Sequence, residues 1–182
     1  MLKEIVSRRS IRKYKDTPVT DEQLQKILEA GRLAPTGSNT QPLRFIVLKN
    51  EEARRKVMEV DGGQEWMLQA PLIIGCVGDL SCRIDDCSKV NVNEHDNLEE
   101  TKQVLRDCAI GIESMMLQAE HMGLGTCYTG WYEQEPMKAA LGVPDYCYVA
   151  GVLVVGYADE APAARPRRAL EDITYIDCWG NK

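Results

Sequence analysis

Aromatic residues are scarce in this sequence: they make up 6% of its 182 residues, and Phe45 is the only phenylalanine. Long apolar runs are missing as well. The longest, residues 148–158, is far shorter than the roughly 20 residues that a membrane-spanning helix needs. The opening residues, MLKEIVSRRS, lack the apolar segment of a secretory signal. We therefore expect a cytoplasmic protein that does not associate with a membrane.

Cysteine usage argues against a disulfide framework and against a metal site. The seven cysteines are an odd number and include no C-x-x-C pair. Cys76, Cys82 and Cys87 lie close together in the sequence, but they lack a fourth ligand at a spacing that zinc would need. We expect free thiols in a reducing compartment, some of them buried as small apolar groups.

Side chains suited to acid–base or nucleophilic chemistry are few. His95 and His121 are the only histidines, and no G-x-S-x-G, H-E-x-x-H or P-loop sequence occurs. An enzyme with this sequence would therefore depend on a cofactor that carries the chemistry itself.

Positive charge is concentrated near the two ends of the chain. The net charge is −6, which disfavours binding to nucleic acids and other polyanions. Basic residues nevertheless cluster between Arg8 and Lys15 and again between Arg165 and Arg168. Two compact basic clusters in an acidic chain predict a site for a small anion.

Hydrophobic periodicity predicts a mixture of helices and strands within one domain, residues 1–182. Strands are expected at 45–48, 72–77, 126–128 and 146–155, and helices at 2–8, 20–34, 51–60, 64–70, 98–122 and 136–141. The short β-branched run at 45–48 is expected to be a buried strand. Since strands and helices do not alternate regularly, an α+β layered sandwich is favoured over a doubly wound sheet.

Three segments of this pattern have further implications. Apolar residues recur on several faces of the 98–122 helix, which predicts burial nearly all round. Residues 78–97 are polar and without period, which indicates a loop or a mobile lid. Residues 159–182 contain two prolines and are expected to form an extended arm. A long apolar helix and such an arm in a short chain suggest a dimer whose subunits exchange arms.

The first basic cluster, R-R-S-I-R-K-Y from Arg8 to Tyr14, is suited to a phosphate monoester. That group carries nearly two negative charges, which guanidinium forks and the Ser10 hydroxyl can satisfy by charge-assisted hydrogen bonds. A solvated basic loop is the alternative. For the second cluster, R-P-R-R from Arg165 to Arg168, the alternative is a solubilising tail.

Two further segments are suited to a planar ring. In A-P-T-G-S-N-T-Q-P, Asn39 and Gln41 each offer a donor and an acceptor to the edge of a heterocycle, although a turn that caps itself is the alternative. The segment G-L-G-T-C-Y-T-G from Gly123 follows a helix and precedes a strand, which is the reverse of a dinucleotide fingerprint. It predicts instead a flat ring close to the backbone of Thr129 and Gly130.

Taken in order, these segments resemble the FMN-dependent nitroreductase family. The matching parts are R-R-S-I-R from Arg8, A-P-T-G-S-N-T-Q-P from Ala34, D-x-A-I from Asp107, G-L-G-T-C-Y-T-G-W from Gly123 and R-P-R-R-A-L-E-D-I from Arg165. Together they span essentially the whole chain. Leu43 departs from the pattern, since many relatives carry an aromatic residue there, and residues 81–97 match no part of it.

The resemblance implies a three-layer α+β sandwich with a mixed, mostly antiparallel sheet flanked by helices. It also implies an intertwined homodimer that binds FMN at the subunit interface, with the 159–182 arm packing on the partner subunit. The implied FMN-binding residues are Arg8, Arg9, Ser10 and Arg12 at the phosphate and the pyrimidine side, Asn39 and Gln41 reaching the flavin from the other subunit, the backbone of Thr129 and Gly130 near flavin N5, and Arg165 and Arg167 at the phosphate. A shift of one residue would bring Arg168 to the phosphate instead.

The activity that the resemblance implies is a ping-pong hydride transfer from NADH or NADPH to a small acceptor such as a nitroaromatic, a quinone or a flavin. No catalytic side chain is expected, because flavin N5 carries the chemistry. One alternative is an FMN-binding carrier or sensor without turnover. Another is a specialised member of the family that performs reductive dehalogenation or flavin fragmentation.

Overall fold

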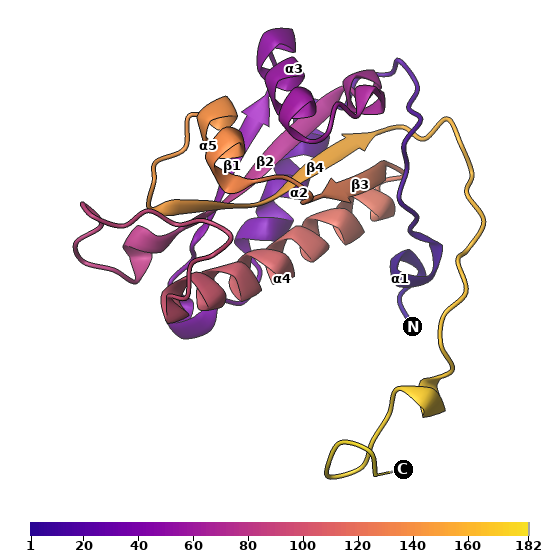
Figure 1. Ribbon diagram of the computed structural model, residues 1–182. Coiled ribbons are helices and arrows are strands. Elements are labelled where there is room, and N and C mark those ends of the chain that lie inside the picture. The colour runs from indigo at the N-terminus through magenta and orange to yellow at the C-terminus, as the bar shows by residue number, and fades with distance from the viewer. Residues whose placement is uncertain (182) are drawn as a thin grey trace.

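A four-stranded antiparallel sheet forms the centre of the computed structural model, which describes residues 1–181 (Figure 1). The strands lie in the order β1-β2-β4-β3, and each neighbouring pair is antiparallel. An isolated parallel bridge joins Ser10 to Thr126 of the edge strand β3. The strands are β1 (Leu43–Leu48), β2 (Leu72–Asp79), β3 (Gly125–Thr129) and β4 (Cys147–Gly156).

Helices cover both faces of this sheet and make the structure a three-layer sandwich, as expected (Figure 1). One face packs on α2 (Asp21–Arg32) and α4 (Glu99–His121), and the other on α3 (Glu51–Val60) and α5 (Gln134–Leu141). Because side chains alternate along a strand, successive residues of β4 enter opposite cores. Val152 and Val154 belong to the core under α3 and α5, whereas Leu153 and Val155 belong to the core over α2 and α4.

Glycine lets α2 and α4 approach closely. A Cβ on Gly111 of α4 would lie 2.6 Å from Cδ2 of Leu43 and 3.3 Å from the carbonyl oxygen of Gly31 in α2. A larger side chain at position 111 would therefore push the two helices and β1 apart. Leu43 is partly buried at this junction and packs against the core over α2 and α4.

Most of the predicted elements are confirmed. Thr20 and Gln23 form the expected capping box at the start of α2, and α3 has the predicted bounds. The predicted helix at residues 64–70 is wrong: this segment is a 3₁₀ helix, η2 (Glu65–Gln69). Pro71 disfavours helical geometry in Ala70, which is extended with ψ of 138° and ends the segment.

Burial differs from the prediction at two places. The α4 helix is not buried all round, because Ala109 is exposed and Ile110 is 46% exposed. The edge strand β1, expected to be buried, is fully buried only at Leu48. The exposed surface of α4 at Ala109 and Ile110 is apolar, and a globular monomer would gain by covering it. In β1 the one exposed side chain is that of Arg44.

The loop after β2 is anchored to the body of the protein. After the short helix η3 (Leu80–Cys82), residues 83–98 form the loop that the sequence predicts. Val92 within it is fully buried, and its carbonyl oxygen accepts a hydrogen bond from Lys138 Nζ at 3.0 Å. This anchoring favours a fixed loop over the mobile lid that was the other expectation.

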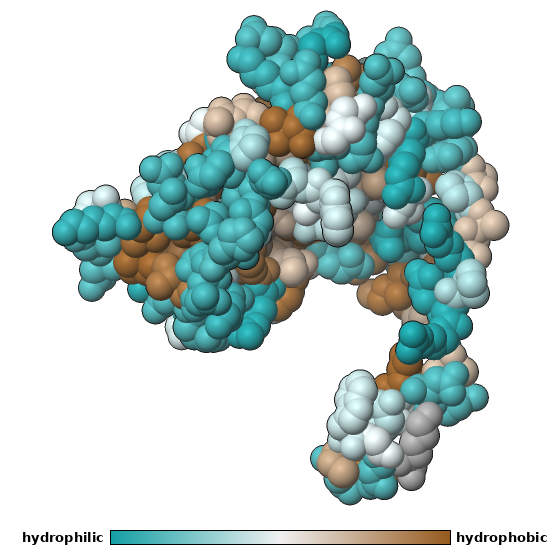
Figure 2. Space-filling model, viewed as in Figure 1, coloured by the Kyte–Doolittle hydropathy of each residue, from teal (hydrophilic) through white to brown (hydrophobic). Residues whose placement is uncertain are grey.

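The two chain ends run side by side along one edge of the molecule (Figure 1). The first end contains α1 (Lys3–Ser7), and the arm contains only the short helix η4 (Leu170–Asp172). Figure 2 shows the last part of the arm standing apart from the body. Apolar side chains on it are exposed, with Trp179 at 88%. Within residues 1–181, no helix has the length and apolar character needed to cross a membrane.

Candidate functional site

The two basic clusters meet at one cavity. A hollow of about 710 Å³ lies between the N-terminal segment and the start of the arm. All six residues predicted at the anion line it, whereas Arg168, the alternative, does not. The six residues are Arg8, Arg9, Ser10, Arg12, Arg165 and Arg167. Segments more than 150 positions apart in the sequence thus contribute to one surface with five arginines and one acidic residue, Glu160. The Glu160 carboxylate accepts hydrogen bonds from the backbone N–H groups of Arg12 and Lys13.

Backbone hydrogen bonds place the N-terminal segment between the sheet edge and the arm. The N–H of Ile11 donates to the carbonyl of Thr126 in β3 at 2.9 Å, and the N–H of Asp159 donates to the carbonyl of Lys13 at 2.9 Å. Gly125 is required for this approach, because a Cβ there would lie 2.6 Å from Ile11 Cγ1. The fold therefore holds Ser10 and Arg12 against the edge of the sheet.

Arg9 is largely engaged in capping α1. Its Nη1 donates to the carbonyl oxygens of Val6, Ser7 and Arg8 at 2.8, 2.9 and 2.8 Å. These carbonyls lie at the end of the helix and lack intrahelical partners. Among residues 1–181, by contrast, the Arg8 guanidinium has no hydrogen-bond or ion-pair partner. Arg8 therefore keeps more of its donors for an anion than Arg9 does.

Arg12 lies over an aromatic ring. Its guanidinium carbon is 5.9 Å from the centre of the Trp66 ring, and Trp66 Nε1 donates to Gln64 Oε1 at 3.1 Å. A cation this close to a ring face is attracted by the negative face of the ring. Trp66 therefore helps to orient Arg12, a role that neither residue type nor spacing indicated.

The predicted turn residues Asn39 and Gln41 lie outside this cavity in the single chain. They occupy η1 (Gly37–Asn39) and the residues that follow it. Ser38, Asn39 and Gln41 have φ of 54°, 55° and 50°, a left-handed conformation that is uncommon for residues other than glycine. Such backbone strain is concentrated at functional sites in proteins.

Thr129 and Gly130 lie at the end of β3, beside a second hollow of about 260 Å³ that Gly130 and Tyr128 line. Tyr128 donates its hydroxyl to the carbonyl of Ala150 at 2.6 Å. Its ring crosses Gly151, where a Cβ would lie 2.1 Å from the ring. Glycine in β4 thus leaves room for an aromatic side chain beside the predicted ring-binding backbone.

Asp61 is a buried carboxyl near Thr129 that nothing in the sequence singles out. It is 1% exposed, and neither of its oxygens has a hydrogen-bond partner within residues 1–181. Burial raises the pKa of Asp61, and the nearby Thr129 hydroxyl and Gln64 amide only partly oppose this effect. Asp61 therefore destabilises the folded chain when it is ionised.

The variant Asp61→Asn is expected to be more stable than the wild type at pH 7. As the pH rises, the unfolded chain loses this proton near 3.8, whereas the folded protein retains it to higher pH. The resulting loss of unfolding free energy is therefore absent below pH 3.8 and complete above the raised pKa of Asp61. We expect a gain in unfolding free energy on the order of 1 kcal/mol at neutral pH.

Urea denaturation at pH 7 and at pH 3.5 measures this difference. The exposed Asp16→Asn change is the control and should alter stability little at either pH. A loss of stability in Asp61→Asn at pH 7 would mean that the ionised carboxylate makes a favourable contact, contrary to this account.

Comparison with known proteins identifies the family. The family model described as Nitroreductase family matches residues 5–157. The chain belongs to the nitroreductase family. Nitroreductase-family relatives include the FMN reductase (NAD(P)H) of Bacillus subtilis, 29% identical over all of this chain and 75% of the relative. They also include the NADPH-flavin oxidoreductase of Vibrio harveyi, 28% identical over 91% of this chain and 69% of the relative.

Solved structures in the nitroreductase family have the same fold. The NADPH:FMN oxidoreductase of Vibrio harveyi complexed with NAD+ superposes with a TM-score of 0.87 at 26% identity, covering 99% of this chain and 78% of that one. The hypothetical oxidoreductase YcnD of Bacillus subtilis superposes with a TM-score of 0.87 at 29% identity, covering 99% of this chain and 74% of that one. The family and the fold that the sequence motifs implied are both confirmed.

Proposed function

We propose that this protein is an FMN-dependent oxidoreductase that takes hydride from NADH or NADPH and reduces small acceptors. The observation that carries the proposal is the convergence of both basic clusters on one cavity at the edge of the sheet. Relatives named for FMN reduction and NAD(P)H oxidation support it. When bound, FMN would accept a hydride at N5 and deliver electrons onward, so the protein needs no nucleophile of its own.

The residues of the cavity fit the phosphate of FMN. Arg8, Arg165 and Arg167 supply guanidinium forks, and Ser10 supplies a hydroxyl. We propose that Arg12, which Trp66 orients, faces the pyrimidine side of the ring, where a positive charge stabilises the reduced, anionic flavin. The backbone of Thr129 and Gly130 would then lie near N5.

A homodimer would complete this site. Asn39 and Gln41 lie away from the cavity in one chain, and we propose that they reach the flavin of the partner subunit. Exposed apolar side chains would be covered in such an assembly. They include Leu2, Ile5 and Val6 on α1, Ile110 on α4, and Leu170 and Trp179 on the arm. We further propose that residues 1–182 form one domain and that the 159–182 arm packs on the partner.

We propose ping-pong turnover, in which the nicotinamide leaves before a nitroaromatic, quinone or flavin occupies the same site. A carrier without turnover is the alternative, and leucine at position 43, together with the unmatched loop at residues 81–97, would fit it. Leu43 begins β1 and packs against Gly111 of α4, so position 43 contributes to the packing of these two elements and gives the carrier alternative no specific support.

Anaerobic mixing of FMN-loaded protein with NADH and, separately, with NADPH tests the proposed activity. Rapid loss of the visible flavin absorbance is expected with at least one donor, followed by recovery when a quinone or nitroaromatic is added. Loss of colour without recovery by any acceptor, or no loss with either donor, would favour the carrier instead.

Arg8→Ala is expected to weaken FMN binding more than Arg9→Ala does. The Arg8 guanidinium has no hydrogen-bond partner within residues 1–181, whereas Arg9 Nη1 donates to three carbonyl oxygens. Loss of one charge-assisted hydrogen bond corresponds to about a tenfold weaker affinity or more. Fluorescence titration of each variant with FMN measures the two dissociation constants. Equal effects, or a larger effect of Arg9→Ala, would contradict this division of roles.

A further inference from the structure

The turn that carries Asn39 and Gln41 is strained and needs an external support. Three of its residues other than glycine adopt left-handed backbone geometry within four positions. Hydrogen bonds inside the turn are local: the N–H of Gln41 donates to Thr36 Oγ1 at 3.1 Å, and Thr40 Oγ1 donates to the carbonyl of Gly37 at 3.1 Å. Short polar contacts of this kind also form in unfolded chains, so they do not by themselves fix the strained form.

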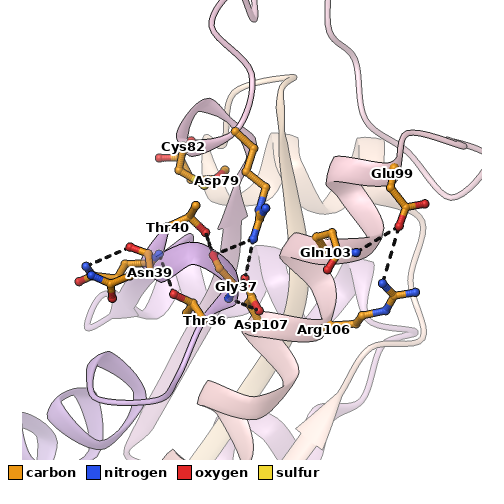
Figure 3. Close-up of polar contacts among 12 residues, drawn as sticks. Thr36, Gly37, Asn39, Thr40, Asp79, Cys82, Glu99, Gln103, Arg106 and Asp107 are labelled. Carbon is orange, nitrogen blue, oxygen red and sulfur yellow. Dashed lines mark hydrogen bonds and ion pairs between the residues drawn. The ribbon is translucent and has the colours of Figure 1, made fainter.

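Asp107 and Arg83 bind the backbone N–H and carbonyl of Gly37 from outside the turn. Figure 3 shows the Asp107 side chain beside Gly37. The N–H of Gly37 donates to both carboxylate oxygens of Asp107, at 3.1 and 3.2 Å. Arg83 Nη2 donates to the carbonyl oxygen of Gly37 at 3.0 Å and to Asp107 Oδ2 at 3.3 Å. Both polar groups of one residue are therefore held by one ion pair.

This ion pair is largely shielded from water. The side chains of Asp107 and Arg83 are 9% and 18% exposed. Charge-assisted hydrogen bonds are stronger in such surroundings than at an exposed surface. A Cβ at position 37 would lie 2.8 Å from Arg83 Nη2, so a larger residue there would displace the Arg83 guanidinium from Gly37.

The three partners come from distant parts of the chain. Asp107 lies in α4, Arg83 begins the anchored 83–98 loop, and Gly37 precedes β1. We propose that Asp107 and Arg83 are positioning residues that hold the 37–41 turn in its left-handed form and so fix Asn39 and Gln41 for flavin binding. This inference rests on the proposed function for its ligand, whereas the contacts of Asp107 and Arg83 with Gly37 do not depend on that function.

A double-mutant cycle separates positioning from a merely structural role. Asp107→Ala is expected to weaken FMN binding by about tenfold or more in the wild-type chain. In an Asn39→Ala/Gln41→Ala background the same change should weaken binding less than twofold, because the side chains it positions are gone. An equal loss in both backgrounds would overturn the inference, as would no loss in the wild-type background.

Two variants keep the test decisive if Asp107→Ala folds poorly. Asp107→Asn retains an acceptor for the Gly37 N–H and loses the ion pair, and Arg83→Gln removes the charge on the other side. Each is expected to give an intermediate loss of FMN affinity. The control is Arg106→Ala on the same helix, whose exposed side chain lies 3.8 Å from Glu99 (Figure 3). It should leave FMN affinity within twofold.

Amide hydrogen exchange distinguishes failure of this inference from failure of the proposed function. The N–H groups of Asn39 and Thr40, which donate to Thr36 and Gly37 carbonyls, should exchange faster in Arg83→Gln than in Arg106→Ala. Wild-type protein that binds no FMN would refute the proposed function. Unchanged exchange in the turn, or FMN binding by Arg83→Gln as tight as that of the wild type, would refute the positioning role of Asp107 and Arg83.

Discussion

Ser10→Ala/Arg12→Ala protein is expected to purify without colour. The change removes a hydroxyl and a guanidinium that line the cavity between the N-terminal segment and the arm. Each hydrogen bond to a charged group contributes about 1.5–3 kcal/mol, so the pair should account for roughly a 100-fold change in FMN affinity or more. The visible absorbance of the purified protein relative to its ultraviolet absorbance measures flavin content, and titration with FMN gives the affinity.

The matched control is Lys26→Ala, which also removes a basic side chain from the surface. Lys26 forms an exposed ion pair with Glu22 on α2 and does not line the cavity. Its flavin content should equal that of the wild type. Circular dichroism checks that the double variant is folded. A folded double variant that retains its full flavin content would show that the cofactor site has been assigned to the wrong residues.

Lys138→Met is expected to destabilise the protein by about 1–3 kcal/mol, the cost of leaving neutral acceptors without a donor. Lys138 is 2% exposed, and its Nζ donates to the carbonyl oxygens of Val92 and Asp145 at 3.0 and 3.2 Å and to Asn91 Oδ1 at 2.9 Å. Methionine has a similar length but offers no donor, so the buried Val92 carbonyl and the two part-buried acceptors would lose their partner. Urea denaturation measures the change in unfolding free energy.

Lys56→Met provides the comparison for this prediction. Lys56 pairs with Glu52 at 2.8 Å on the exposed side of α3, where an ion pair contributes at most about 1 kcal/mol. The Val92 N–H, which donates to Asp145, should also exchange faster in Lys138→Met because the 83–98 loop loses its anchor. Similar stabilities of the two variants would mean that Lys138 does not anchor the loop.

Local patterns in the sequence predicted most of the elements. Thr20 and Gln23 identified the start of α2, and the period of apolar residues gave α3 and α4. The convergence of the two basic clusters also followed from charge distribution together with the resemblance to the family. These features depend on neighbouring residues, or on motifs that occur along the chain in the same order as in the family.

Tertiary contacts account for what the sequence could not predict. Arg9 looked equivalent to Arg8, and only the geometry at the end of α1 directs it to carbonyl oxygens. The ion pair between Asp107 and Arg83 acts on a residue 70 positions from Asp107, and Lys138 anchors a loop 46 positions away. No spacing rule connects such residues, because the fold alone brings them together.

Titration of flavin-free protein with FMN and with riboflavin tests the central claim most directly. The arginines of the cavity should recognise the phosphate, so FMN is expected to bind at least 100-fold more tightly than riboflavin, which lacks it. This preference should decrease strongly in Arg8→Ala. Equal binding of the two flavins, or no uptake of FMN by the folded protein, would contradict the account.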